Sequence, residues 1–282
     1  MDDLVSTEWL AGALGAGDLI ALDASAHLPD ARRDARAEFR TAHIPGARFL
    51  DLASFTDPDS PVPSAIPNAA QFTQRMAELG IGPGDRIVIY DDSAVKTSAR
   101  AWFILRLHGA RQVAILDGGL GKWRAEGRAL ETGEPVVRAT APFGAARGPG
   151  AIRSKQDMLA NLGSGAEQVV DARGAGRFSG AEPDFRPEIA SGHIPGSRNL
   201  PFGQLLNADG TFKDAAGIRA AFAQAGVDLE RPVATTCGGG VTAAVLLFAL
   251  HLIGKGDVAL YDGSWSEWGA DPATPKATGS PA

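Results

Sequence analysis

A repeated set of short motifs limits the folds open to this chain more than any other feature of the sequence. The run Ala-His-Ile-Pro-Gly-Ala-Arg around His43 returns as Gly-His-Ile-Pro-Gly-Ser-Arg around His193, an offset of 150 residues. An Asp-Gly pair with a tryptophan five residues after the glycine occurs at Asp117 and again at Asp262, an offset of 145. Because the motifs keep their order and nearly keep their spacing, the sequence predicts two copies of one domain.

The chain length of 282 residues suits two domains of ordinary size. We expect a first domain over residues 1–134, a linker over 135–150 and a second domain over 151–282. The linker contains three prolines, which predict a semi-rigid connection. The tail, residues 271–282, is rich in Pro, Thr, Ala and Gly, and we expect it to be poorly ordered.

Each copy has the pattern of a strand, a helix and a second strand. In the first copy, residues 86–90 and 113–116 are β-rich, and residues 98–108 have helical apolar spacing. The second copy repeats this order over residues 232–236, 241–253 and 258–261. Units of this length predict an α/β fold with a parallel sheet flanked by helices. Ligands of such sheets bind beyond the carboxyl ends of the strands.

The single cysteine, Cys237, lies at such a strand end. It opens a candidate active-site loop that consists of Cys237, Gly238, Gly239, Gly240, Val241 and Thr242. Consecutive glycines let backbone N–H groups point inward, and a helix N-terminus behind them favours an anion such as a thiolate. The alternative is a buried apolar cysteine in an ordinary turn. The sixth residue after the cysteine is Ala243, so the arginine of the cysteine phosphatase motif is missing and backbone amides must hold the anion.

Charge and apolar patterning exclude several kinds of partner. The net charge of −6 gives no electrostatic reason to expect nucleic acid or an anionic membrane. The longest apolar stretch, residues 241–254, is shorter than the ~20 residues of a membrane span. The N-terminus lacks the pattern of a signal peptide, and one cysteine cannot form an internal disulfide, so we expect a cytoplasmic protein. Neither zinc-ligand spacing nor a phosphate-binding loop motif occurs, so we expect no metal or organic cofactor.

Together, the paired His-Ile-Pro-Gly blocks, the Asp-Gly…Trp blocks and the Cys-Gly-Gly-Gly-Val-Thr-Ala loop resemble the tandem rhodanese family. The branch that they most resemble is that of the 3-mercaptopyruvate sulfurtransferases, over roughly residues 4–271. The resemblance implies two tandem rhodanese-like domains, of which only the second is catalytic. Counting back 25 residues from each Asp-Gly pair reaches Cys237 in the second copy and Asp92 in the first. We therefore expect a non-catalytic first domain with Asp92 at the cysteine position.

The resemblance also implies roles for four further residues. Arg177 and Arg186 match the pair that holds the substrate carboxylate, and guanidinium groups bind carboxylates bidentately. The alternative is two solvated loop arginines. His43 and Asp34 are candidates for a proton relay, although His43 also fits a purely structural role. The serine of that relay is Gly239 here, so the relay cannot be transferred intact.

The reaction that the resemblance implies is sulfur transfer, which makes the protein an enzyme. Sulfur would pass from 3-mercaptopyruvate to Cys237 as a persulfide, with release of pyruvate, and then to cyanide or a thiol such as that of a thioredoxin-like protein. One alternative is thiosulfate as the donor, although that branch usually places basic residues where this chain has Gly238 and Gly239. Another is a non-catalytic persulfide carrier.

Overall fold

The computed structural model describes residues 1–145, 148 and 151–280. They form two compact units. Unit 1 comprises Met1–Pro58, Ile66–Gly148 and Ala208–Phe212. Unit 2 comprises Asp59–Ala65, Pro149–Asn207 and Lys213–Ala282. The units differ from the expected domains mainly in two short segments, 59–65 and 208–212, and in the assignment of the expected linker.

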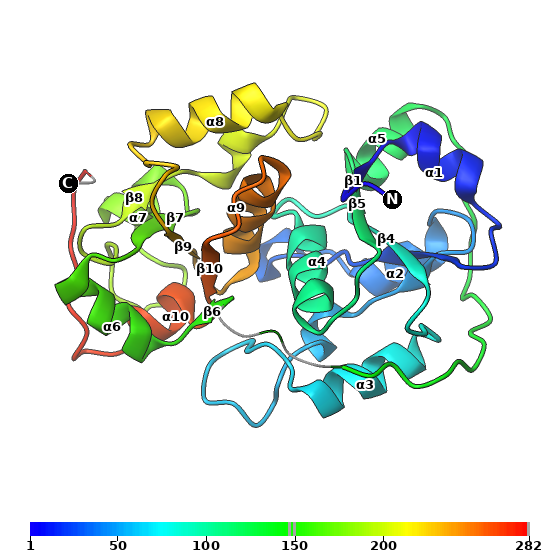
Figure 1. The fold of residues 1–282 in the computed structure, drawn as a ribbon, viewed down its shortest axis with the longest axis horizontal. Coiled ribbons are helices and arrows are strands. Elements are labelled where there is room, and N and C mark those ends of the chain that lie inside the picture. The colour runs from blue at the N-terminus through cyan, green and yellow to red at the C-terminus, as the bar shows by residue number, and fades with distance from the viewer. Residues whose placement is uncertain (146–147, 149–150, 281–282) are drawn as a thin grey trace. The chain divides into compact units, whose positions relative to one another are not determined.

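Unit 1 is built on a parallel five-stranded sheet (Figure 1). Its strands are β1 (Leu4–Val5), β2 (Leu19–Asp23), β3 (Arg48–Phe49), β4 (Arg86–Tyr90) and β5 (Val113–Leu116). Its α-helices are α1 (Thr7–Ala13), α2 (Ala35–Thr41), α3 (Ala69–Glu78), α4 (Thr97–Leu107) and α5 (Gly119–Ala125), with 3-10 turns at Pro29–Ala31 and Leu52–Ser54. The strand order is β1-β5-β4-β2-β3, and every neighbouring pair is parallel.

Unit 2 repeats this architecture. Its strands are β6 (Ile152–Arg153), β7 (Gln168–Asp171), β8 (Arg198–Asn199), β9 (Val233–Thr236) and β10 (Val258–Tyr261), in the equivalent order β6-β10-β9-β7-β8. Its α-helices are α6 (Lys155–Ser164), α7 (Ala175–Ser179), α8 (Ala215–Gln224), α9 (Val241–Leu252) and α10 (Ser264–Trp268), with a 3-10 turn at Phe202–Leu205. The prediction of two tandem α/β domains with parallel sheets is confirmed.

Helices cover both faces of the unit 2 sheet. In Figure 1, α8 and α9 lie on one side of this sheet, and α6 and α10 lie on the other. Helix α9 is buried along almost its whole length, from Ala243 to Leu250, which explains why it is apolar all round. Among the described residues, no helix is both long enough and apolar enough to cross a bilayer.

The first part of the expected linker packs against unit 1. Phe143 is buried, and its ring meets the ring of Phe72 edge to face at a centroid distance of 5.5 Å. The hydroxyl of Thr73 donates a hydrogen bond to the carbonyl of Phe143. This part of the expected linker is therefore anchored to unit 1 through Phe143. Residues 146–147 and 149–150 lie outside the described residues.

The expected flexible tail is in fact packed onto unit 2. Ala277 exchanges two backbone hydrogen bonds with His193, at 2.8 and 3.0 Å. The indole N–H of Trp268 donates to the carbonyl of Pro275, and Gly279 N–H donates to Ser179 O. We call residues 271–279 the strap of unit 2. The prediction of poor order is wrong here because composition does not reveal these backbone pairings; residues 281–282 lie outside the described residues.

Unit 1 has an equivalent strap, residues 129–133. Glu131 exchanges backbone hydrogen bonds with His43, and Gly133 N–H donates to Arg40 O. The indole N–H of Trp123 donates to Ala129 O, as Trp268 does to Pro275. The repeat therefore extends beyond its last helix in both copies.

Candidate active site

Cys237 follows β9 directly, at the carboxyl end of the unit 2 sheet, and α9 begins four residues later. Its residue exposure is 2 %. Gly240, the N-cap of α9, has a φ of 78°, a left-handed conformation that glycine adopts without strain. A Cβ at Gly238 would meet nothing within 4 Å, so this side of the loop is open. The loop thus places a buried cysteine in front of a helix N-terminus, beside free space.

The segment that opens α10 holds the first two loop residues in place. Cys237 N–H donates to the hydroxyl of Ser264 at 3.2 Å, and Cys237 O accepts from Trp265 N–H at 2.9 Å. Gly238 O accepts from both the N–H and the hydroxyl of Ser266, at 2.8 and 2.5 Å. Two hydrogen bonds therefore fix the peptide groups on either side of Cys237, and two more fix the peptide that follows Gly238.

A buried ion pair between Asp171 and Arg173 packs against the segment that opens α10. Arg173 donates to both carboxylate oxygens of Asp171, with an Nη2–Oδ2 distance of 2.6 Å, and also to Gly192 O. The same guanidinium lies over the indole ring of Trp265, 4.5 Å from its centroid. Trp265 in turn binds Ala190 O through its indole N–H. Trp265, whose backbone N–H binds the cysteine carbonyl, is thus held in place by Arg173 and by Ala190 O.

Arg186 is connected to the cysteine loop through Ser266. Its Nη1 donates to the Ser266 hydroxyl at 2.6 Å, while Nε and Nη2 donate to the two carboxylate oxygens of Asp184 at 2.9 and 3.1 Å. Burial raises the pKa of Asp184, but the hydrogen bonds from Arg186 outweigh burial and hold this pKa below its usual value. Asp184 is therefore an ionised partner that orients the guanidinium.

Arg177 and Arg186 both pack against one aromatic ring, that of Phe185. The guanidinium carbons are 5.3 and 4.8 Å from the ring centroid of Phe185, a residue that is 60 % exposed. Arg177 comes from α7, and Arg186 from the loop that follows. The structure thus brings together the two arginines that the sequence singled out, on the surface of unit 2.

The hydrogen-bond register of the repeat places Asp91, and not Asp92, at the cysteine position. Tyr90 O accepts from Ala24 N–H in unit 1, and Thr236 O accepts from Ala172 N–H in unit 2, so Tyr90 and Thr236 are equivalent. The residues that follow them are Asp91 and Cys237. Asp91 O then accepts from Leu120 N–H as Cys237 O accepts from Trp265 N–H. The prediction was wrong by one residue because the offset is 146 in the central strand but 145 at the Asp-Gly pair.

The unit 1 loop also differs in length and chemistry. Helix α4 begins at Thr97, six residues after Asp91, so this loop is two residues longer than the cysteine loop. The Asp92 carboxylate pairs with Arg33 at 2.8 Å and with Arg124 at 3.2 Å. Burial raises the pKa of Asp23, at the end of β2, to about 6, and the charge of Asp91 contributes in the same direction. The end of this sheet therefore has the carboxylate of Asp91 where unit 2 has the thiol of Cys237.

His43 and Asp34 each have a structural partner within unit 1. His43 is buried, its Nδ1 lies 2.7 Å from Phe39 O, and its ring stacks on the Phe39 ring. Asp34 caps α2 by accepting from Ala37 N–H at 3.0 Å. His193 repeats the arrangement of His43 in unit 2, with Nδ1 2.8 Å from a backbone carbonyl. These contacts support a structural role and give the relay no independent support.

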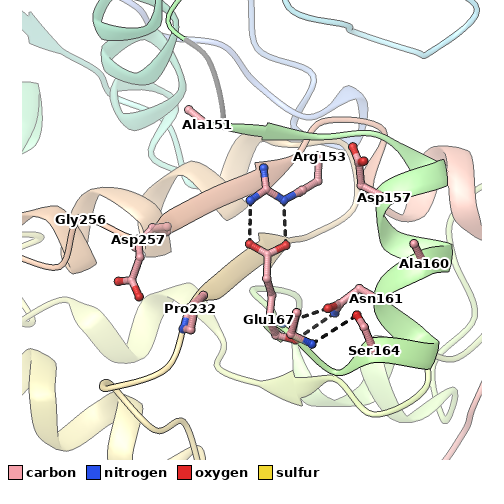
Figure 2. Close-up of a pocket in the computed structure, with 12 residues that line it drawn as sticks. Ala151, Arg153, Asp157, Ala160, Asn161, Ser164, Glu167, Pro232, Gly256 and Asp257 are labelled. Atoms are coloured by element: carbon pink, nitrogen blue, oxygen red, sulfur yellow. Dashed lines mark hydrogen bonds and ion pairs between the residues drawn. The ribbon is translucent and has the colours of Figure 1, made fainter.

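A cavity of about 740 Å³ lies at the opposite end of the unit 2 sheet (Figure 2). Pro232 and Asp257, which directly precede β9 and β10, line it. Arg153 and Glu167 face each other there and form a bidentate ion pair at 2.7 and 2.8 Å. Because these charges satisfy each other and the thiol of Cys237 lies at the other end of the sheet, we place the chemistry at Cys237 instead.

Three residues of the site were missed by the sequence analysis: Ser264, Ser266 and Asp184. The signal for the two serines is present in the repeat, because Gly119 and Gly121 stand at the corresponding positions of unit 1. Asp184 is one of several acids near the two arginines in the sequence, with Glu182 and Glu188. Nothing in its spacing distinguishes it as their partner.

Comparisons with known proteins agree with this geometry. The sequence profile of the Rhodanese-like domain matches residues 6–126 and 154–271. A mouse (Mus musculus) protein named 3-mercaptopyruvate sulfurtransferase is 42 % identical over 271 residues, which cover 94 % of this chain and 91 % of that protein. A chicken (Gallus gallus) protein named thiosulfate sulfurtransferase is 42 % identical over 272 residues, which cover 94 % and 92 %.

A solved structure shares the fold over nearly its full length. SseA from Escherichia coli, described among the 3-mercaptopyruvate sulfotransferases, superposes with a TM-score of 0.85 at 35 % identity. The match covers 95 % of this chain and 100 % of that chain. The chain therefore belongs to the rhodanese family, with one rhodanese-like domain in each half.

Proposed function

We propose that the chain is a sulfurtransferase that takes sulfur from 3-mercaptopyruvate onto Cys237 and passes it to a thiol or to cyanide. The observation that carries this proposal is the connection between Arg186 and the cysteine loop through Ser266. It joins a guanidinium, a group suited to bind a carboxylate, to the residue that follows the nucleophile. Relatives named for either sulfur donor are equally similar to the chain, so identity does not choose between them.

The proposed reaction has two steps, and Cys237 takes part in both. In the first, the thiolate attacks the donor sulfur and the carbon–sulfur bond breaks. Its electron pair goes to the carbon, which takes up the thiol proton, so the products are pyruvate and the Cys237 persulfide. In the second, the acceptor attacks the outer sulfur, the sulfur–sulfur bond breaks and the thiolate returns. The positive end of the α9 dipole stabilises the thiolate at both ends of this cycle.

The donor preference rests on the hydrogen-bonding capacity of Arg186. A guanidinium has five N–H donors. Asp184 takes one from Nε and one from Nη2, and Ser266 takes one from Nη1. One N–H on Nη1 and one on Nη2 are left for a bidentate carboxylate. Arg177, which packs against the same Phe185 ring, adds a second positive charge.

The first unit, in this proposal, is not catalytic. Asp91 stands at the cysteine position, and a carboxylate cannot form a persulfide. We further propose that the physiological acceptor is a thiol such as that of a thioredoxin-like protein and that the enzyme works in the cytoplasm. Cell fractionation with an antibody to the chain tests that location.

Steady-state kinetics with both donors tests the proposal. We expect a higher kcat/KM for 3-mercaptopyruvate than for thiosulfate, with cyanide as the common acceptor. A higher value for thiosulfate would identify the alternative donor. If neither donor is turned over although Cys237 becomes persulfidated, the chain is a sulfur carrier and not an enzyme.

A further inference from the structure

We propose that Ser266 is a positioning residue that aligns Arg186 and the Cys237 loop with each other. This inference rests on the proposed function and assigns a specific role to a side chain of α10. Its hydroxyl lies between the group that would hold the donor's carboxylate and the loop that would attack the donor's sulfur.

The hydroxyl of Ser266 can make both contacts in only one way. Arg186 has no acceptor, so its Nη1 must donate to Ser266 Oγ. The one proton of the hydroxyl then goes to Gly238 O. The same oxygen lies 3.4 Å from the position that a Cβ at Gly239 would occupy, so a side chain there would meet it. A movement of either the guanidinium or the loop would break this directional chain.

The repeat provides an internal comparison. Unit 1 has Gly121 where unit 2 has Ser266, and Gly119 where unit 2 has Ser264. Both copies form the turn and the backbone bond to the preceding strand end, through Leu120 and Trp265 respectively. The fold therefore does not require the serines, and they occur only in the copy that has the cysteine.

Ser264 shows that this segment accepts backbone strain to supply a hydroxyl. Its φ is 48°, in the left-handed region, where Gly119 has a φ of 59°. A non-glycine residue is strained in that region. The Ser264 hydroxyl accepts from Cys237 N–H and donates to Tyr261 O, which offsets that strain. Two serines of one turn thus serve the same loop, and Ser266 alone extends the contact to Arg186.

The test compares Ser266→Ala with a matched control, Ser197→Ala. Ser197 is also buried in unit 2, and its hydroxyl also donates to a backbone carbonyl, Ile194 O, at 2.7 Å. We expect Ser266→Ala to lower kcat/KM for 3-mercaptopyruvate by about tenfold, which is the low end for a lost charge-assisted hydrogen bond. The loss with thiosulfate should be smaller, because that donor has no carboxylate to align. Ser266→Thr should restore the donor ratio, and Ser197→Ala should lower only the melting temperature.

A double-mutant cycle identifies the partner of Ser266. In an Arg186→Ala background, Ser266→Ala should no longer change the ratio of the two donors, because the residue it aligns is gone. Equal losses for both donors in Ser266→Ala, or a full additional loss in the double variant, would show that Ser266 only stabilises the loop. If the wild type does not turn over 3-mercaptopyruvate, the proposed function is wrong and this inference falls with it. If it does and the donor ratio of Ser266→Ala is unchanged, only this inference is wrong.

Discussion

Replacing Arg186 with alanine removes the side chain that we propose to bind the donor carboxylate. The lost interaction is a charge-assisted hydrogen bond pair, and one such bond contributes about 1.5–3 kcal/mol. We therefore expect kcat/KM for 3-mercaptopyruvate to fall roughly 10- to 150-fold. Arg186→Lys should recover little of this, since an ammonium cannot bind Asp184 and a carboxylate with the geometry of a guanidinium.

The same change leaves Asp184 without its partner, and this effect must be separated from catalysis. The Asp184 side chain is 3 % exposed, so its charge loses stabilisation when the guanidinium is removed. We expect the melting temperature of Arg186→Ala to fall, and Asp184→Asn in addition should restore part of it. The double variant keeps the catalytic loss while it removes the unpaired charge, so it isolates the binding contribution.

The assay measures kcat/KM for both donors with the wild type, Arg186→Ala, the double variant and Arg177→Ala. Arg177 lies over the ring of Phe185 and tests the second charge while the hydrogen bonds between Arg186 and Asp184 stay in place. We expect thiosulfate activity to fall less than 3-mercaptopyruvate activity in each arginine variant. Equal losses for the two donors would refute the reasoning, because they would mean that the arginines support the loop instead of the carboxylate.

Three further outcomes are expected. Cys237→Ser should abolish sulfur transfer, and mass spectrometry of the wild type after donor treatment should show one added sulfur at that residue. Asp23 has a folded pKa of about 6 against an ordinary value of 3.8, so its contribution to the free energy of unfolding is present below about pH 4 and falls by ~3 kcal/mol as the pH rises to 6. Urea unfolding from pH 4 to 7 should show this decline. A decline of the same size in the Asp23→Asn variant would contradict the assignment to Asp23. Ending the chain at Ala270 removes the strap of unit 2 and should lower the melting temperature of that unit, whereas a truncation without effect would mean that the strap pairs too weakly to matter.

The tandem fold was accessible from the sequence because the repeat is carried by turns. The His-Ile-Pro-Gly and Asp-Gly motifs stand at chain reversals of the fold, and such positions tolerate few residue types. Cys237 was accessible for a similar reason, since a cysteine before a glycine run at a strand end has few structural explanations. The pairing of Arg177 and Arg186 about Phe185 depended on the family resemblance, because spacing alone does not show that a loop folds back.

The errors arose where a feature depends on contacts and not on composition. Asp92 was predicted at the cysteine position, which Asp91 occupies, because a one-residue difference in length between the copies does not show in either motif. The strap looked disordered because its pairing partner, His193, lies far away in the sequence. Ser266 was overlooked because the role of a serine depends on its hydrogen-bond partners. These partners, Arg186 and Gly238, belong to two other segments of the sequence.

The strap of unit 2 has a consequence for how the chain is made. The indole of Trp268 and the backbone of His193 gain their partners only at Pro275 and Ala277, so this unit cannot close until those residues have been synthesised. The strap of unit 1 is complete by Gly133. Because domains fold from the N-terminus during synthesis, unit 1 can close its strap long before unit 2 can. Until residues 275–277 have been made, the indole N–H of Trp268 lacks its carbonyl partner, and unit 2 stays open on this side.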